Sequence, residues 1–412
     1  MARKHWMLAA RMLSAAALLA AVPVGLMGVW TAPSPVPAQQ SFEVNTTGQE
    51  LRLACAPGIF DAAVNPAVQV VAEVSVWPKT DTEPLAGGGT AVLPGTVSRA
   101  EDFPSALATT RYLDGPPVAL ATLPCQVPAN RLALVGGSTD VGEDTVLILS
   151  NPGDKPVTAR VRGYSIGGTL GEAPPMTVPA KSTIAWRPAV WFPEEPRLAL
   201  TVEADGLGVA AWLQSSGFAG EVTRGIAQVG SQSPARELVF PAVGAGAVLN
   251  LLNPGDQPVE ISLEALSEDG AGALNGTQTL LAEPGVTQLT LPEVAGLRLT
   301  GSADLAASIS RQLAGAPDPV VEGELVESRE LIGPSSALTR LVLPVAGTVT
   351  LVDQSGRVEQ VEVEAGQELT FSTPRWAVLT QELTTDFGSA WAAAPLGEAG
   401  LTESSVQVVV SP

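Results

Sequence analysis

Val146–Val157 has the sequence VLILSNPGDKPV, and the same stretch returns at Val248–Val259 as VLNLLNPGDQPV. Nine of the twelve positions are identical, and the two copies start 102 residues apart. In each copy, proline fixes φ at the second turn position and glycine permits a positive φ at the third. We therefore predict two type II turns, each at the tip of a β-hairpin, at Asn151, Pro152 and Gly153 and at Asn253, Pro254 and Gly255.

The repeat extends beyond these two stretches. Arg131, Arg236 and Arg340 each precede an apolar run, at a similar period. A period of this length that carries strands predicts tandem all-β domains, and short alternating strands favour immunoglobulin-like β-sandwiches. The Cys…Trp…Cys pattern of immunoglobulin cores is missing inside the repeats. We place repeat 1 at residues 129–235, repeat 2 at 236–338 and a shorter repeat 3 at 339–412.

Two segments inside these boundaries are too long for tight turns. Gln214–Ala235 and Ala314–Thr339 are predicted as extended links between domains. Residues 42–128, ahead of the repeats, are predicted as an N-terminal β domain.

The N-terminus is typical of an export signal. Arg3, Lys4 and Arg11 precede an uncharged run, Met12–Trp30, and a Pro-rich linker follows at residues 31–41. Residues 1–30 are either a cleaved signal peptide or an uncleaved transmembrane anchor. In both cases the bulk of the chain is extracytoplasmic: a single-pass cell-membrane protein, or alternatively a secreted one.

Cys55 and Cys125 are the only cysteines, and both follow the export segment. An even pair in an oxidising compartment predicts a disulfide bond. A metal site or a redox pair is not indicated, because the two cysteines lack a CxxC spacing and have no histidine near them in the sequence.

Composition and charge exclude some partners. The chain is 45% hydrophobic but only 4% aromatic, so its core must consist of small branched side chains. Its formal net charge is −20. Because such a surface repels phosphate backbones, we expect no nucleic-acid partner.

Histidine chemistry is excluded as well. The one histidine, His5, lies inside the export segment. The exported part therefore has no imidazole for a catalytic triad, a Cys-His pair or a zinc site, and we expect no enzyme activity, no cofactor and no metal. Val135–Thr139, VGGST, lacks the Gly-Lys-Ser/Thr ending of a phosphate loop and is predicted as a turn.

A short aromatic stretch gives the best candidate for ligand contact. Trp186, Trp191 and Phe192 lie close together among prolines, and aromatic rings in loops can stack on sugars. Packing in a core or between domains is the alternative explanation for the same residues.

The run from Arg131 through VGGST to LILSNPGD, after an export segment and a cysteine pair, resembles the actinobacterial exported envelope protein family of unknown function numbered 5719. The resemblance covers most of the chain after residue 50. It implies a protein encoded near envelope glycosyltransferases and, by this association, a cell-wall role, and it transfers no activity and no site residue.

Two functions are consistent with these observations. The first is a non-enzymatic extracytoplasmic envelope protein, a scaffold or partner for cell-wall or glycan assembly machinery such as a membrane glycosyltransferase. The second is a glycan-binding or adhesive module that contacts cell-wall glycan.

Overall fold

The computed structural model describes most of the chain after residue 51. The described ranges are residues 52–61, 65–69, 73–77, 82–92, 107–112, 119–219, 222–244, 246–274, 279–312, 329–334, 337–343, 347–364, 367–385, 388–396 and 407–409. The predicted export segment and linker lie outside them. Within them, no helix has the length and apolar character needed to cross a membrane. Residues Glu50–Pro412 form one compact unit, so the predicted domain boundaries inside it stay predictions.

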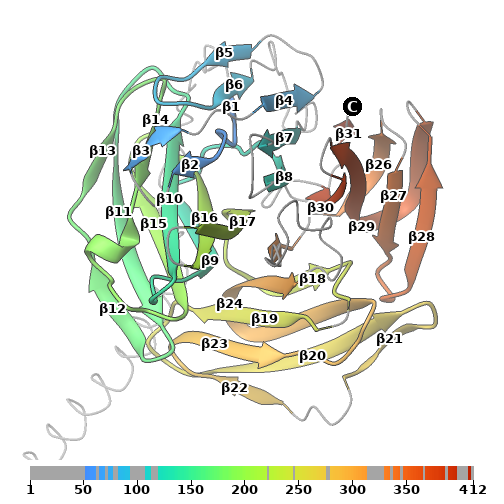
Figure 1. Ribbon diagram of the computed structural model, residues 1–412. Helices are drawn as coiled ribbons and strands as arrows, with labels where there is room; N and C mark the ends of the chain where they lie inside the picture. Colours follow the sequence, from blue (N-terminus) through green and yellow to red (C-terminus); the bar gives the residue numbers. More distant parts are fainter. Residues whose placement is uncertain are drawn as a thin grey trace, which may run out of the picture. The chain divides into compact units, whose positions relative to one another are not determined.

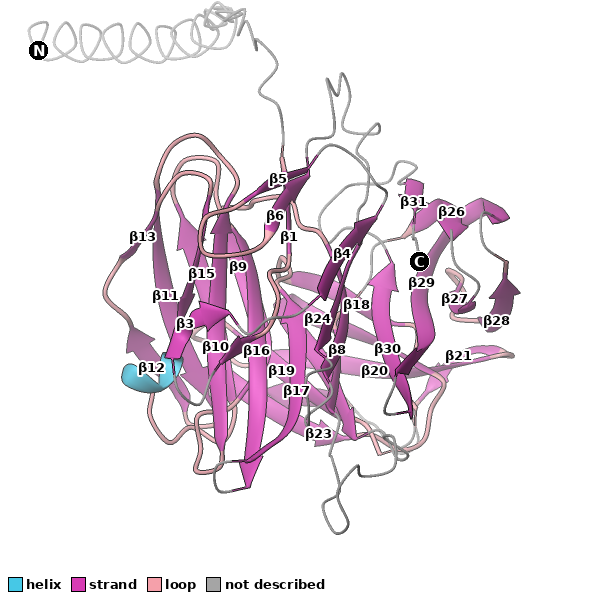
Figure 2. Cartoon of the chain, turned by 45° about the horizontal axis from the view of Figure 1, so that its top comes forward, coloured by secondary structure: helices cyan, strands magenta, loops and turns pink. Residues whose placement is uncertain are grey.

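The described residues are almost entirely strands and loops, which confirms the all-β class (Figure 2). Their one helical element is a short 3-10 turn, η2 (Pro188–Val190). The N-terminal part forms three small sheets, ordered β1-β6-β5, β2-β3 and β4-β7-β8. Its strands are β1 (Leu53–Cys55), β2 (Phe60–Asp61), β3 (Asn65–Gln69), β4 (Glu73–Trp77), β5 (Thr82–Pro84), β6 (Thr90–Val92), β7 (Leu107–Tyr112) and β8 (Ala119–Pro124).

The predicted disulfide bond is confirmed. Cys55, at the end of β1, is bonded to Cys125, which directly follows β8. The neighbouring residues Ala54 and Gln126 also exchange two backbone hydrogen bonds, of 2.9 and 2.7 Å. The bridge therefore joins two segments that are paired by their backbones as well.

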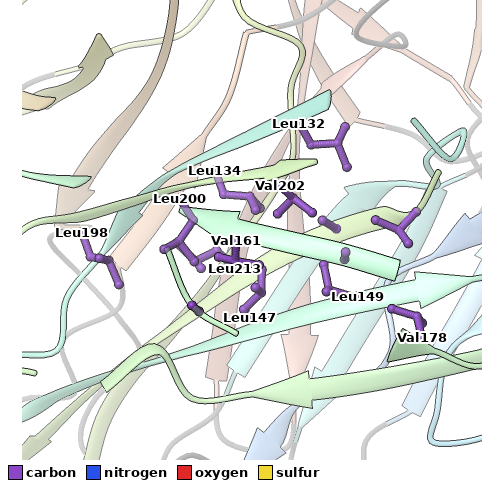
Figure 3. Packing of buried hydrophobic residues seen from close by; sticks show 14 of the residues in the cluster. Leu132, Leu134, Leu147, Leu149, Val161, Val178, Leu198, Leu200, Val202 and Leu213 are labelled. Atoms are coloured by element: carbon purple, nitrogen blue, oxygen red, sulfur yellow. The ribbon is translucent and has the colours of Figure 1, made fainter. Parts of the chain in front are cut away.

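Repeat 1 contains two sheets, ordered β14-β10-β16-β17 and β12-β11-β15-β9, with β13 paired to β11 (Figure 1). Leucine and valine side chains from both sheets meet in one buried cluster (Figure 3). The strands are β9 (Arg131–Gly137), β10 (Glu143–Asn151), β11 (Val157–Ser165), β12 (Gly168–Glu172), β13 (Met176–Val178), β14 (Ser182–Trp186), β15 (Leu198–Ala204), β16 (Ala210–Ala219) and β17 (Val222–Gly230).

Strand β10 is buried on both faces, which explains its unbroken apolar run. Leu147 and Leu149 point into the cluster between the two sheets. Val146 and Ile148, on the opposite face, pack against Phe60 and other residues of the N-terminal part. A strand covered on both sides has no solvent-facing positions, so the usual alternation of polar and apolar residues is lost.

Repeat 2 has its own core, supplied mainly by β19, β20 and β24. The first half of β24 pairs with β18 and β20, and its second half pairs with β19 and β25, so one strand serves both sides of the core. The strands are β18 (Ala235–Phe240), β19 (Val248–Asn253), β20 (Val259–Ser267), β21 (Gly270–Ala273), β22 (Leu280–Ala282), β23 (Gly285–Thr290), β24 (Gly296–Gln312) and β25 (Arg329–Ile332).

Repeat 3 has a smaller core, and here too one long strand serves both of its sides. Its long strand β29 pairs with β26 through its first half and with β27 and β30 through its second half. The strands are β26 (Leu338–Leu343), β27 (Gly347–Val352), β28 (Val358–Val363), β29 (Gln367–Thr385), β30 (Gly388–Leu396) and β31 (Gln407–Val409).

The Asn-Pro-Gly-Asp segments do not form the predicted hairpins. Strand β10 pairs with β14 and β16, whereas β11 pairs with β12, β13 and β15, so the segment carries the chain from one sheet to the other. The second copy connects β19 to β20, which likewise do not pair. Both copies have a proline where the outgoing strand begins, Pro156 and Pro258, and proline has no N–H to donate to a ladder.

The predicted type II turns are also wrong. Neither Gly153 nor Gly255 has a φ in the left-handed region. The asparagine side chain makes the turn instead: Asn151 Oδ1 accepts a hydrogen bond of 3.0 Å from the Gly153 N–H, and Asn253 Oδ1 does the same for Gly255 at 3.0 Å. This is an Asx turn, in which a side chain replaces a backbone carbonyl.

In repeat 3 the predicted hairpin is present. Strands β27 and β28 pair directly, from Val352 opposite Val358. The connecting residues, Asp353–Arg357, contain no proline. Asp353 takes the place of the two asparagines, and its Oδ1 accepts hydrogen bonds from the backbone N–H groups of Ser355 (2.8 Å) and Arg357 (3.0 Å).

The predicted link Gln214–Ala235 is not an extended connection. It contains the end of β16 and the whole of β17, and these two strands form an antiparallel pair. The predicted link Ala314–Thr339 falls partly outside the described residues, and its described part includes β25, which pairs with β24.

Among the described residues, apolar seams join neighbouring parts of the compact unit. Residues of the N-terminal part pack on β10 and β16. Leu252, Val286 and Ala306 of repeat 2 pack on the outer face of the sheet that contains β9, β11 and β15. Val239 and Leu266 of repeat 2 pack on residues of repeat 3.

Candidate functional site

A polar cavity of about 300 Å³ lies where strands of repeat 1 meet strands of repeat 2. Its volume is at the low end of the range for small-molecule sites, roughly 300–1,000 Å³. Repeat 1 contributes β9, β10, β16 and β17, and repeat 2 contributes β19, β23 and β24. The polar side chains of the wall are Ser138, Glu143, Asp144, Arg197, Ser215, Ser216, Asn250, Gln288 and Ser310.

A row of hydrogen-bonded polar side chains crosses the repeat 2 wall. Gln288 Nε2 on β23 donates to Asn250 Oδ1 on β19 at 3.1 Å. Asn250 Nδ2 in turn donates to Ser310 Oγ on β24 at 3.2 Å. Asn250 is only 3% exposed. Because amides and hydroxyls both donate and accept, such a row can pair with either kind of group on a ligand.

The repeat 1 wall is built by a close approach of β9 to β10. A Cβ on Gly137 would lie 3.1 Å from the Thr145 hydroxyl oxygen, so a larger residue there would crowd the Thr145 side chain. Thr145 Oγ1 accepts a hydrogen bond from the Ser138 N–H (2.8 Å) and donates to the Ser138 carbonyl (2.6 Å). The predicted turn at Val135–Thr139 is therefore the end of a strand and part of the cavity wall.

Charged groups of both signs lie at this wall. Asp144 is 5% exposed and forms an ion pair with Arg187. Burial raises the pKa of the Asp144 carboxyl group above its usual value, although Arg187 acts in the opposite direction. Arg197 donates to the Pro196 carbonyl at 2.5 Å, and in the described part of the chain its buried Nε has no hydrogen-bond partner. With Glu143 also present, the wall has no large excess of either charge.

The segment from Arg187 to Arg197, here called the aromatic loop, is fastened to the cavity wall by Thr139. The Thr139 hydroxyl donates to the Phe192 carbonyl (2.6 Å) and accepts from the Glu195 N–H (3.0 Å). The Thr139 N–H donates to the Glu195 carbonyl at 2.8 Å. Since Thr139 directly follows Ser138, the loop and the wall are held together.

The three aromatic residues predicted as ligand contacts are separated by the structure. Phe192 is 4% exposed and packs in the core of repeat 1, where its ring meets Trp186 edge to face at 6.3 Å between centroids. Trp186 is partly buried against the same core. Trp191 is 49% exposed. Only Trp191 therefore presents a substantial part of its ring to solvent.

The asparagine side chains of the two Asx turns also hold neighbouring backbone segments together. Asn151 Nδ2 donates to the carbonyls of Lys155, Val178 and Pro179 at 2.8, 3.2 and 3.1 Å. Asn253 makes the matching bonds to Gln257 and Ala282 at 2.8 and 3.0 Å. Within the described ranges, no group of three or more histidine, cysteine, aspartate or glutamate residues could hold a metal ion.

Sequence reasoning missed the cavity because its wall is assembled from strands that are far apart in the chain. One signal was present. Within the two near-identical stretches, Ile148 of the first copy corresponds to Asn250 of the second, a buried apolar position exchanged for a polar one.

The profile of a family of unknown function, DUF5719, matches residues 82–320. The match covers more than half of the chain and includes the whole cavity wall. The chain belongs to the DUF5719 family. The resemblance inferred from the sequence is confirmed at this level. Searches of curated proteins and of solved structures gave no match. Membership of DUF5719 assigns no activity, so function has to be argued from the structure.

Proposed function

We propose that this chain is a non-enzymatic extracytoplasmic envelope protein that acts as a scaffold or partner for cell-wall or glycan assembly machinery, such as a membrane glycosyltransferase. In this proposal, immunoglobulin-like sandwiches in tandem are held outside the membrane by the N-terminal segment. The observation that carries it is the set of buried seams between the repeats, because a scaffold has to hold its parts at fixed positions.

The seam between repeats 1 and 2 includes a specific polar link. Gln232, which is buried, donates from Nε2 to the Ala307 carbonyl (2.8 Å) and accepts from the Ala307 N–H (3.1 Å). The Gln232 backbone also pairs with Ala133 on β9. A buried amide satisfied on both sides fixes one relative position, since any displacement leaves polar groups without partners. These contacts support a rigid unit rather than freely jointed domains.

The Cys55–Cys125 bond supports the extracytoplasmic part of the proposal. Disulfides persist in oxidising compartments and are rare in the cytoplasm. The test is protease treatment of intact cells from which the wall has been removed. We expect the chain after about residue 40 to be digested; a chain that stays intact until the cells are lysed would refute export.

The partner role is tested by chemical crosslinking in intact cells, followed by purification of the full-length chain. We expect a membrane-embedded glycan assembly enzyme among the crosslinked proteins. A crosslinked set that contains no envelope assembly component would contradict the scaffold role.

The absence of catalysis is tested separately. We expect the purified full-length chain to hydrolyse no peptide, ester or glycoside, since no exported residue is a histidine. Turnover of any such substrate that is lost in the Glu194→Gln and Glu195→Gln variants would overturn the non-enzymatic assignment and make the aromatic loop an active site.

A glycan-binding or adhesive module is the second candidate, favoured by the exposed ring of Trp191. Its neighbour Val190 is exposed too, so the tip of the aromatic loop offers an apolar surface on which a sugar face could stack. Cell-wall glycan should then quench tryptophan fluorescence, and the Trp191→Ala variant should lose that response. Equal quenching of the wild type and the variant would exclude the loop tip as the contact.

A further inference from the structure

One row of residues differs in polarity between the corresponding sheets of repeats 1 and 2. In repeat 1 the strand order β14-β10-β16 places Ala185, Ile148 and Trp212 in one row across the sheet. In repeat 2 the equivalent order β23-β19-β24 places Gln288, Asn250 and Ser308 in the corresponding row (Figure 1). Three apolar side chains have been replaced by three polar ones.

The apolar row of repeat 1 is explained by its cover. Ile148 and Trp212 are fully buried under Ala54, Ala56 and Phe60 of the N-terminal part, and Ala185 is packed against the same cluster. Burial of large apolar side chains at this junction stabilises the contact by the ordinary hydrophobic effect.

The polar row of repeat 2 borders the cavity instead. Asn250 and Gln288 line the cavity, together with Ser310 on the strand that carries Ser308. On the same sheet face, one step along the strands, Leu252 and Ala306 are apolar and pack against repeat 1. On this face Asn250, Gln288 and Ser310 therefore border the cavity, and the apolar residues beside them form the contact with repeat 1.

Polar groups at such a position need partners. A buried amide or hydroxyl without a hydrogen bond costs roughly 1–3 kcal/mol, and the corresponding row of repeat 1 is apolar. Ser308 Oγ and Arg197 Nε are buried and have no hydrogen-bond partner within the described residues. Of these two residues only Arg197 lines the cavity, so one donor of the wall is not used by the described contacts.

The charges of the wall disfavour some classes of ligand. Two carboxylates, Glu143 and Asp144, disfavour phosphate and other strong anions, and Arg197 with the paired Arg187 disfavours a strong cation. Side chains that donate and accept at once match hydroxyl groups, which do the same. We propose that this cavity is a binding site for a neutral polyhydroxylated ligand, of the size of a single sugar ring at the end of or within a glycan.

This site is independent of the scaffold role and of the aromatic loop tip, because neither a partner protein nor Trp191 forms part of it. The two variants that test it copy the residues of repeat 1. Asn250→Ile introduces the side chain found at position 148, and Gln288→Ala introduces the one found at position 185. Both remove polar groups from the wall without adding a charge, so the fold is expected to be retained.

The experiment measures binding of methyl glycosides of glucose, mannose, galactose and N-acetylglucosamine to the purified full-length chain, by saturation-transfer NMR and calorimetry, free of sugar-based detergents. We expect at least one glycoside to bind, with affinity at least tenfold weaker in each variant. Leu281→Ala, at an exposed position of β22 outside the cavity wall, serves as the control and should bind as the wild type does. A cooperative thermal transition of each variant checks that the fold is retained, so that a loss of binding can be assigned to the wall.

Three results would overturn the site. The first is no binding of any of the four glycosides up to roughly 10 mM, a concentration that detects an affinity of about 1 mM. That outcome would make the cavity a water-filled space only. The second is binding that is unchanged in both variants. The third is tighter binding of inorganic phosphate than of the glycosides. None of these results bears on crosslinking to an assembly enzyme, so the scaffold proposal stands or falls separately.

Discussion

At the residue scale, one polar turn-forming side chain recurs at the same place in each repeat, and it is buried in repeats 1 and 2. Asn151 and Asn253 are each 1% exposed and satisfy several carbonyls that would otherwise be buried without partners. Asp353 holds the matching place in repeat 3, where a hairpin leaves the turn more open to solvent. The turn is therefore formed by the side chain of the first residue of the motif, and not by the backbone conformation of the glycine.

This assignment predicts opposite sensitivities within one motif. Asn151→Ala should lower the free energy of unfolding by about 2–3 kcal/mol, because it leaves buried carbonyls without donors. Gly153→Ala should stay within about 1 kcal/mol of the wild type, because φ at Gly153 is not left-handed. Urea unfolding of the full-length variants measures both.

Gly208→Ala is the positive control for a strained glycine. Gly208 has a φ of +82°, and a Cβ there would lie 2.3 Å from the Ala129 carbonyl carbon. A loss of more than about 2 kcal/mol is expected. If Gly153→Ala proved as damaging as Gly208→Ala, the Asx-turn assignment would be wrong.

Asp353 makes the stability of the fold depend on pH. Burial acts to raise the pKa of its carboxyl group, but hydrogen bonds from Ser355 and Arg357 and the contact with Arg375 outweigh it and lower the pKa to about 2. A lowered pKa means that the stabilisation is present above the unfolded value, about 3.9, and is lost as pH falls through about 2.

The Asp353→Asn variant, which introduces the residue of repeats 1 and 2, isolates this contribution. The difference in stability between wild type and variant should be constant from pH 7 to about pH 5, shrink below about pH 4, and nearly vanish near pH 2. Denaturant unfolding at several pH values measures it. A difference that does not change with pH would show that the carboxylate is not the source.

At the element scale, the aromatic loop depends on a glycine in a neighbouring strand. A Cβ on Gly163 of β11 would lie 2.8 Å from the ring of Phe192, and that ring is held in the core by the Thr139 hydrogen bonds to the loop. Gly163→Ala should therefore displace the ring and destabilise the fold by about 1–3 kcal/mol.

The matched control is Gly217→Ala, in strand β16, where a Cβ would meet nothing within 4 Å. The control should leave stability near the wild-type value. The emission of Trp186, whose ring meets Phe192, should shift in the Gly163 variant and stay unchanged in the control. No shift in the Gly163 variant would mean that the loop accommodates the methyl group without moving.

At this scale, the sequence predicts where the strands lie but not how they pair. Alternating and apolar runs locate strands correctly, because burial on one or both faces determines them locally. Strand pairing is not local. The same Asn-Pro-Gly-Asp run was compatible with a hairpin or with a crossing between sheets, and only the prolines at 156 and 258 indicated the crossing.

The candidate site could be predicted even less. Its wall joins residues as far apart as Ser138 and Ser310, and no spacing rule brings them together. Of the aromatic residues singled out from the sequence, Phe192 lies in a core because β11 offers it a glycine, which composition alone does not reveal.

At the scale of the whole molecule, the disulfide bond joins the end of β1 to the residue after β8 and so closes the N-terminal part just ahead of the repeats. Replacing both cysteines by alanine, or reducing the bond, should lower the free energy of unfolding by about 4 kcal/mol for a loop of 70 residues. Trp212, fully buried against Ala54 and Phe60, reports the loss of this packing by fluorescence. A change below about 1 kcal/mol would show that the packing of the N-terminal part suffices without the bond.

The bond also determines how the chain responds to tension. A pulling force that enters from the N-terminal side reaches Cys55 and passes through the sulfur atoms to Cys125, so the enclosed residues carry none of it. An extended residue spans about 3.3–3.6 Å, so those 70 positions would otherwise add roughly 240 Å of contour length on rupture. A chain stretched between the cell surface and a partner would keep this length in reserve until a reductant cut the bond, and its extension under load would then depend on the redox state of its surroundings.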